Sequence, residues 1–501
     1  MGPASVFRAH TAGIDEGFHV TKANSDPFIG IQISPISFID EGVDEVLDTL
    51  QQRVGVNVLL IGTISWLGLK VGRRISHALE GWPDHGVPAP YSMEGGSYIK
   101  VRPEYYSGTF IRDFASRDPE MAGRDILDLV IPKARARGMK VIPEFMEPLF
   151  KYAGHGSAAA VQIPNMPQCL EVDLLGRYAG EPCTSNPDYR RWWHGIVEEH
   201  ARNYEIDGIM WCNERNSPLD RMMQGQAPGC FCHHCRREGA ERGIDVERVR
   251  SAFTGVWDFF KRAKSGETFV DGTFTEFLRV LLRHPEVLLW ERLWLDRSKD
   301  LDKELYGIVK WCNPALSFGL NVWNRNHFNP IRKAQWSWEE QTDYADWVKP
   351  ITYQHQAGEV FDKEMGFFAN TILRDYTKDE FVPAVSSILG LKEVPIDRVI
   401  QEGMDPDTYV YGQCADAVRG CKGKADVYMG IGVDAPRVRA DQAVCTPDTV
   451  YRSVLATYRA GGKGVVYSPN YAGMNLANLD GGARALEELG LKAPNPAAAA
   501  E

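Results

Sequence analysis

The 501-residue sequence contains no uninterrupted apolar run of about 18 residues, the length that a membrane-spanning helix requires. It also lacks an N-terminal basic segment followed by an apolar stretch, so no secretory leader is visible. The chain carries 67 Asp and Glu against 56 Lys and Arg, and its formal net charge is −11. Because an acidic chain repels polyanions, nucleic acid and anionic membranes are poor candidates for partners. We therefore expect a cytoplasmic protein, unless a leader has been removed, with no nucleic-acid or membrane partner.

Several common catalytic signatures are missing as well. No G-x-S-x-G motif is present to expose a nucleophilic serine, and the His and Asp cage of a hydrolytic metallobarrel is absent. The stretch GGKG at 461–464 precedes a strand instead of opening a helix, so it predicts a turn and not a phosphate-binding loop. Ten cysteines are too few for a disulfide scaffold in a chain of this length, and we expect reduced thiols.

The sequence does contain a regular alternation of short apolar segments and longer amphipathic segments. Most apolar segments lack internal alternation, as expected for parallel strands that are covered on both faces. Eight consecutive strand–helix units predict an α/β protein with a (β/α)8 fold, the TIM barrel. The predicted strands are 28–34, 56–63, 140–147, 207–214, 316–324, 348–355, 426–434 and 463–470.

We predict one barrel domain over residues 1–490, because no internal repeat or low-complexity domain divides the chain. Three long loops elaborate this barrel after the second, fourth and sixth strands. The Ala-rich end of the chain is predicted to be a disordered tail. The loops cover residues 64–118, 215–315 and 356–425, and the tail covers residues 491–501.

Catalytic groups of this fold gather at the carboxyl ends of the strands. In this sequence those ends carry carboxylate, amide and aromatic side chains. Carboxylates and amides bind sugar hydroxyls, while Trp and Tyr stack on the apolar face of a sugar ring, so a carbohydrate substrate is favoured. The candidate substrate-binding residues are Trp66, Glu144, Glu147, Asn213, Asn321, Trp323, Tyr353, His355, Glu359, Tyr467 and Asn470.

Hydrolysis of a glycosidic bond usually needs two carboxyl groups, one to protonate the leaving oxygen and one to attack the anomeric carbon or activate water. Glu214 is the candidate acid, because it follows an apolar strand where desolvation would raise its pKa. Asp434 is the favoured second carboxylate, since it closes the seventh strand, roughly across the barrel. Glu144, Glu147 and Glu359 are the alternatives at the same rim.

Three cysteines and two histidines share the six positions 230–235. The C-x-C-x-x-C pattern supplies three thiolates, whereas a closed tetrahedral zinc site has four ligands. Cys183 begins the helix that leads into the fourth strand, at the same barrel end as this loop. We predict a structural zinc site, with metal-free thiols as the alternative. Its ligands would be Cys183, Cys230, Cys232 and Cys235.

The segment CTSNPDYRRWWHGIVEEHARNYEIDGIMWCNE, followed by CFCHHCRREG, resembles the family 42 glycoside hydrolases, the β-galactosidases of the large N-E barrel clan. The resemblance covers residues 183–239. It implies that the four cysteines bind zinc and that Glu214 is the acid/base. The family nucleophile is a Glu at the end of the seventh strand, where this chain has Asp434. Other segments, such as GIGVDAP, resemble uncharacterised barrel hydrolases related to the same clan.

The sequence therefore predicts a β-galactosidase-like glycoside hydrolase. We expect exo action on an oligosaccharide or a small glycoside, because the aromatic loop 64–118 would cap a short pocket. Another carbohydrate-active barrel enzyme, a lyase or an isomerase, is one alternative, since fold does not fix function. A non-catalytic sugar-binding barrel is another, and a homo-oligomer is left open.

Overall fold

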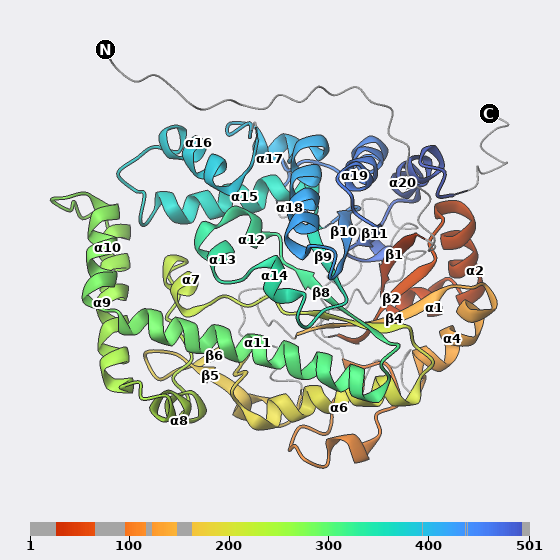
Figure 1. Ribbon diagram of the computed structural model, residues 1–501, viewed down its shortest axis with the longest axis horizontal. Helices are drawn as coiled ribbons and strands as arrows, with labels where there is room; N and C mark the ends of the chain where they lie inside the picture. The colour runs from red at the N-terminus through yellow and green to blue at the C-terminus, as the bar shows by residue number, and fades with distance from the viewer. Residues whose placement is uncertain are drawn as a thin grey trace.

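The computed structural model describes residues 27–65, 96–116, 123–147, 163–392, 394–435, 437 and 439–492. Its centre is a parallel sheet that closes on itself, because β1 pairs with β2 on one side and with β11 on the other (Figure 1). The other pairs follow chain order, so the predicted (β/α)8 barrel is confirmed. The barrel strands are β1 (Phe28–Ile33), β2 (Val58–Ser65), β4 (Lys140–Met146), β7 (Gly208–Cys212), β8 (Ser317–Val322), β9 (Trp347–Thr352), β10 (Asp426–Gly432) and β11 (Gly464–Ser468).

Helices surround the barrel, as Figure 1 shows. Several begin at a capping side chain that accepts backbone N–H groups, such as Asp125 before α4 and Asn186 before α6. Among the described residues, no helix combines the length and hydrophobicity needed to cross a membrane. The helices that flank the strands are α1 (Pro35–Asp40), α2 (Val43–Asp48), η1 (Thr49–Val54), α4 (Ile126–Ala136), α6 (Pro187–Asn203), α11 (Glu286–Cys312), α15 (Gln354–Ala369), α18 (Tyr411–Cys421), α19 (Pro447–Arg459) and α20 (Leu476–Glu488).

The long loops carry further elements. In Figure 1, α9 and α10 stand at the edge of the molecule. Residues 66–95 and 117–118 of the first loop and residues 493–501 of the tail lie outside the described residues, and the single domain over 1–490 stays a prediction. The loop elements are β3 (Gly96–Ser97), η2 (Pro103–Tyr106), η3 (Met166–Cys169), β5 (Leu170–Val172), β6 (Tyr178–Pro182), α7 (Pro218–Met223), α8 (His233–Glu241), α9 (Val246–Lys264), α10 (Thr273–Arg283), α12 (Arg325–Phe328), α13 (Pro330–Ala334), α14 (Trp338–Gln341), α16 (Lys378–Leu389), α17 (Val399–Glu402), η4 (Pro406–Val410) and η5 (Tyr471–Gly473).

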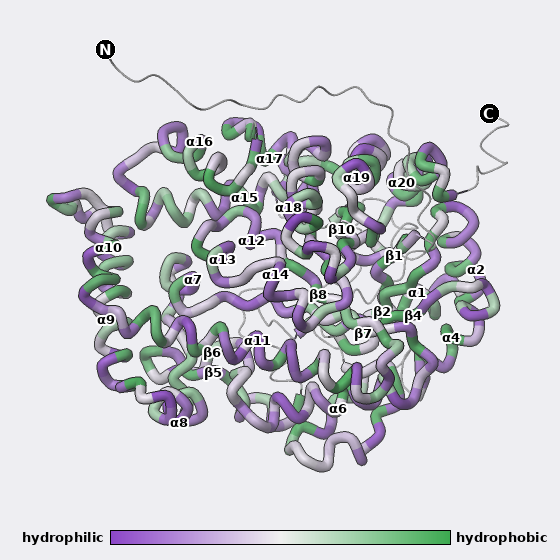
Figure 2. The backbone as a smooth tube through the Cα atoms, viewed as in Figure 1, coloured by the Kyte–Doolittle hydropathy of each residue, from purple (hydrophilic) through white to green (hydrophobic). Residues whose placement is uncertain are grey.

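The inside of the barrel is filled by alternate residues of its strands, because successive strand side chains point to opposite faces. One layer is apolar and holds large rings such as Trp347, which occupies the space that a side chain at Gly319 would need. The outward-facing residues pack against the helices and form the main core. Figure 2 shows the strands as largely hydrophobic, with hydrophilic residues gathered on outer helices such as α8. The inner apolar layer consists of Val58, Leu60, Ile142, Met210, Trp347 and Val466, with Phe28 and Tyr428 packed against it.

Candidate active site

A polar layer follows the apolar layer toward the carboxyl ends of the strands. Its members occur two positions after apolar inward-facing residues, for example Glu144 after Ile142 and Lys349 after Trp347. No sequence expectation includes Gln32 or Lys349, although a lysine in an otherwise apolar strand was a signal that could have identified the site. The five residues are Gln32, Glu144, Cys212, Asn321 and Lys349.

Two carboxylates are connected through this layer by a continuous chain of hydrogen bonds. The ammonium of Lys349 donates to Oε1 of Gln32 at 3.0 Å and to Oδ1 of Asn321 at 2.9 Å. The amide nitrogen of Gln32 donates to Oε2 of Glu144 at 2.8 Å. The amide nitrogen of Asn321 donates to Oε1 of Glu214 at 3.2 Å. Lys349 therefore lies midway between two amides, each of which binds one carboxylate.

Burial sets the protonation of this layer. It raises the pKa of Glu144 to about 7, although the Gln32 amide and the Lys349 charge act in the opposite direction. Burial also lowers the pKa of Lys349 to about 8, against the stabilising charges of Glu144, Cys212 and Glu214. A carboxyl group with a pKa near neutrality can both hold and release a proton at physiological pH. Glu144 is thus suited to acid–base chemistry.

Glu214 lies two residues beyond β7 and is partly exposed. Its Oε1 accepts a hydrogen bond from the thiol of Cys212 at 3.4 Å, in addition to the bond from Asn321. Hydrogen bonds to a carboxylate favour its ionised form. The expected strand-end carboxylate therefore shares the barrel mouth with Glu144, on a neighbouring strand.

An apolar border lies at the same mouth. Tyr353 clusters with Ile351 and Ala435, and the partly buried ring of Trp323 packs against them. Burial raises the pKa of Tyr353, and the nearby charges of Glu214 and Glu144 add to this effect. Two of the predicted aromatic residues are therefore brought together beside the polar layer.

Glu147 is placed differently from its neighbour on β4. It has no exposed surface, and its two oxygens accept hydrogen bonds from Tyr189 Oη and Arg215 Nε, each at 2.6 Å. Because strand side chains alternate, Glu144 faces the barrel interior and Glu147 faces the helix layer. The carboxylate fixes Arg215, directly after Glu214, and its predicted role in substrate binding stays a prediction.

Two further predicted ligands turn away from the mouth. The amide nitrogen of Asn213 donates to Ser298 Oγ at 2.9 Å, on α11. Tyr467 is fully buried against α20, where a Cβ on Gly482 would lie 2.3 Å from its hydroxyl oxygen. Both side chains point outward from their strands toward the helix layer, and their predicted role in substrate binding stays a prediction.

Asp434 and Asn470 hold turns at the ends of β10 and β11. The Asp434 carboxylate accepts from the backbone N–H of Asn475 at 2.7 Å and from the Asn478 amide at 2.9 and 3.0 Å, which fixes the start of α20. The backbone of Asp434 is left-handed, with φ of +50°. The side-chain oxygen of Asn470 accepts from the N–H of Ser34 at 3.1 Å and so connects β11 to the end of β1.

The other predicted rim residues lie on or before α15, or outside the described residues. His355 is buried beside the end of β10, and burial lowers its pKa to about 4, which keeps the ring neutral. Glu359 is partly exposed, and burial raises its pKa despite the charge of Lys363. Trp66 falls outside the described residues.

Four buried cysteines form a compact cluster away from the polar layer. The sulfur atoms of Cys183, Cys230, Cys232 and Cys235 all lie within 4.8 Å of one another. Four sulfurs at Zn–S distances of about 2.3 Å would be separated by roughly 3.8 Å, so this donor set fits a tetrahedral metal ion. The backbone N–H groups of Val172 and Cys232 lie 3.4 and 3.3 Å from the Cys230 sulfur, as expected around a thiolate ligand. The cluster could therefore bind a metal and would join the start of α6 to α8.

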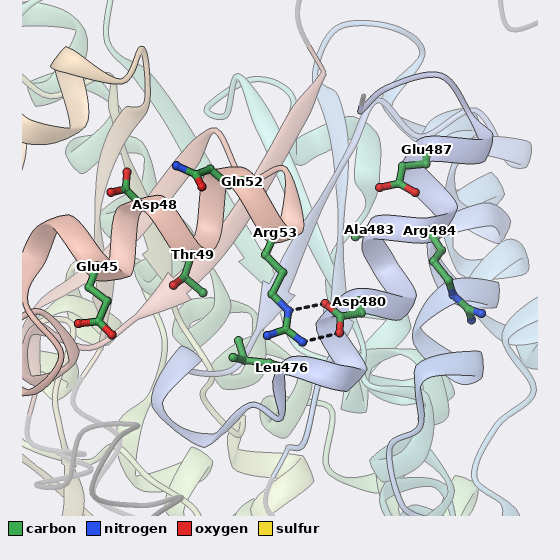
Figure 3. A pocket seen from close by; sticks show the side chains of 10 residues that line it. All are labelled: Glu45, Asp48, Thr49, Gln52, Arg53, Leu476, Asp480, Ala483, Arg484 and Glu487. Atoms are coloured by element: carbon green, nitrogen blue, oxygen red, sulfur yellow. Dashed lines mark hydrogen bonds and ion pairs between the residues drawn. The ribbon is translucent and has the colours of Figure 1, made fainter. Parts of the chain in front are cut away.

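An open groove lies elsewhere on the molecule, between η1 and α20 (Figure 3). Arg53 forms two hydrogen bonds of 2.6 Å with Asp480 across it. None of the predicted site residues lines this groove. Its lining is charged and contains no residue of the candidate site.

The chain matches no known protein-family model and no curated protein. Solved structures with a similar arrangement include a β-galactosidase from the psychrophilic Marinomonas ef1, with 13% identity and a TM-score of 0.48 over 93% of this chain and 61% of that chain. An α-L-fucosidase isoenzyme 2 from Paenibacillus thiaminolyticus has 12% identity and a TM-score of 0.48, over 93% and 49%. The glycoside hydrolase domain of PgaB (BpsB) from Bordetella bronchiseptica has 10% identity and a TM-score of 0.47, over 92% and 98%. The chain thus spans less than two thirds of the length of the first two proteins.

Proposed function

We propose that the protein is a glycoside hydrolase and that Glu144 and Glu214 are its pair of catalytic carboxylates. The observation that carries this proposal is the single hydrogen-bonded chain that connects both groups at the carboxyl ends of the barrel strands. Glycosidic hydrolysis needs two such groups on either side of the scissile bond. Trp323 and Tyr353 beside them offer apolar surfaces for a sugar ring.

In this proposal Glu144 is the proton donor. Its pKa of about 7 leaves a large share of the carboxyl protonated at neutral pH. Glu214 accepts hydrogen bonds from Asn321 and Cys212 and acts as the ionised carboxylate, either as nucleophile or as base. Glu144 thereby replaces Asp434 as the partner of Glu214, because the Asp434 carboxylate is engaged at the start of α20, and the role of acid passes from Glu214 to Glu144.

The substrate class we propose is a neutral carbohydrate, with β-galactosides as the first substrates to test because of the resemblance around Glu214. Exo action is part of the proposal as well, although most of the loop 64–118 on which this expectation rests lies outside the described residues. The cytoplasm is the proposed location. We further propose zinc as the ion in the four-cysteine cluster, where four thiolates would leave no open position for a reacting water.

The test is the release of a chromogenic aglycone from a panel of aryl glycosides. We expect Glu144→Gln and Glu214→Gln each to lower kcat/KM by about 100-fold or more. The matched control is Glu402→Gln, which removes an exposed carboxylate from α17 and should leave the rate unchanged. Wild-type rates in both site variants would overturn the proposal.

Leaving groups of different acidity assign the two roles. A dinitrophenyl glycoside needs little protonation, so it should recover most of the rate in the variant that lacks the proton donor. We expect this recovery in Glu144→Gln and not in Glu214→Gln. The reverse pattern would make Glu214 the acid, as the resemblance to family 42 implies.

A lyase is the second candidate, and Lys349 is the observation that favours it. An amine with a pKa of about 8 at a barrel mouth is suited to Schiff-base formation with a carbonyl substrate. This function ranks second because Lys349 has no exposed surface and already donates to two amide oxygens. Borohydride trapping with a free aldose or ketose tests it, since a covalent adduct on Lys349 would establish the Schiff base.

A further inference from the structure

Lys349 faces two side-chain amides, and the orientation of each amide decides whether its nitrogen or its oxygen faces a carboxylate. Each amide points its oxygen at the ammonium and its nitrogen at a carboxylate, Gln32 toward Glu144 and Asn321 toward Glu214. If either amide were flipped, its NH2 group would face the NH3⁺ donor and its oxygen would face a carboxylate oxygen. The contact between NH2 and NH3⁺ is repulsive in every case, and the contact between the two oxygens is repulsive when the carboxylate is ionised. The position of the ammonium therefore selects one orientation of both amides.

We propose that Lys349 is a positioning residue that sets both carboxylates at once, by holding the oxygens of Gln32 and Asn321 so that their nitrogens bind Glu144 and Glu214. This inference rests on the proposed function in one respect, namely the catalytic roles of Glu144 and Glu214. The hydrogen bonds that carry it are present whatever the reaction.

The barrel is built to accommodate this lysine. A Cβ on Gly430, in β10, would lie 3.0 Å from Cε and 3.3 Å from Nζ of Lys349, so the glycine leaves the room that the ammonium occupies. The charge has no exposed surface, and a buried cation is costly unless polar partners satisfy it. A cost of this kind, in the middle of a strand, is typical of a functional site.

The groups around Lys349 come from several strands. Glu144 on β4, Cys212 on β7 and Glu214 after β7 act on its charge, and the ring of Tyr353 after β9 lies 5.9 Å from its Nζ. Within the described part of the chain, the ammonium donates to Gln32 and Asn321 and not directly to any of these groups. The lysine therefore reaches the carboxylates through the amides.

The first test is Lys349→Met, which keeps an unbranched chain and removes the ammonium. We expect kcat to fall by about 10- to 100-fold with KM within about twofold, because Lys349 does not touch the substrate. The pKa of the Glu144 carboxyl should rise by at least about one pH unit, because the positive charge is gone. Carboxyl-13C NMR measures this titration, and the Glu144→Gln variant assigns the signal. Lys463→Met, an exposed lysine paired with Asp426, is the control and should move neither value.

A double-mutant cycle distinguishes an effect that Lys349 transmits through the Gln32 amide, here called the relay, from a direct effect of its charge on Glu144. If Lys349 acts through Gln32, the titration shift caused by Lys349→Met should shrink in a Gln32→Met background. A full-size shift in that background would overturn the relay. Gly430→Ala is the second variant should Lys349→Met not fold, because it displaces the ammonium while it keeps the charge, and it should shift the Glu144 titration in the same direction.

The outcomes distinguish this inference from the proposed function. An unchanged Glu144 titration in a folded Lys349 or Gly430 variant would overturn the positioning role. A shifted titration in a protein that cleaves no glycoside would support the positioning role and overturn the proposed function.

Discussion

Arg215 and Glu147 form an ion pair that is closed to solvent, with Nε 2.6 Å from Oε2 and side chains only 2% and 0% exposed. Arg215 directly follows Glu214, so this pair fixes the chain at the proposed catalytic carboxylate. The guanidinium also lies 3.2 Å from Glu171, which in turn pairs with Arg221 at 2.7 Å. The loop after β7 is therefore anchored by buried charges as well as by the cysteine cluster.

Glu147→Gln should destabilise the protein strongly. The change leaves the buried Arg215 guanidinium with only Glu171, a carboxylate that also pairs with Arg221. Breaking a buried pair typically costs about 3–5 kcal/mol. Urea unfolding followed by tryptophan fluorescence measures the loss. Glu402→Gln, on an exposed surface, is the control. An unfolding midpoint equal to that of the wild type would show that the pair contributes nothing to stability.

Metal removal should loosen the loop that begins at Glu214. We expect about one zinc ion per chain by elemental analysis, lost in Cys232→Ser because the cluster has no spare thiolate. Cys312→Ser, a cysteine outside the cluster, should keep the metal. Chelation should lower the thermal midpoint and reduce activity together. Protein purified from zinc-supplemented medium without any metal would contradict the assignment.

The pH dependence of stability should report the buried Glu144. Its folded-state pKa is raised from 4.5 to about 7, so between these values the folded protein keeps a proton that the unfolded chain has released. The contribution of Glu144 to the stability of the wild type therefore falls as the pH rises through this window. Glu144→Gln has no such proton, and its free energy of unfolding relative to the wild type should rise by at most about 1.4 kcal/mol per pH unit there. A difference independent of pH would show that Glu144 titrates normally.

Asp434→Asn tests the alternative second carboxylate. Asn keeps an oxygen that can accept from the Asn475 N–H, and it tolerates the left-handed backbone at φ of +50°. Under the proposed pair of Glu144 and Glu214, the variant should keep activity within about threefold. If Asp434 were the nucleophile, the rate would fall by at least about 100-fold. Steady-state kinetics on the same aryl glycoside decides between the two.

The strands were predictable because their apolar runs are short and covered on both faces, and all eight predicted ranges overlap the observed strands. The mouth residues were only partly predictable. Reading the strand ends identified Glu144, Glu214 and Asn321, but it also selected Glu147, Asn213 and Tyr467, which face the helix layer. Which residues of a strand face the barrel interior depends on how the strand packs in the sheet. The position at which the strand ends does not specify it.

The sequence alone determined the order of strands and helices, because local hydrophobic patterns and turn residues specify them without distant contacts. It also identified the four cysteines, since the helix before the fourth strand and the loop after it meet at one barrel end. Only the tertiary structure decided which side chains share the mouth. Gln32 and Glu144 meet although 112 positions separate them, and Lys349 reaches Gln32 across 317 positions. Barrel closure brings such residues together, and closure is a property of the whole sheet.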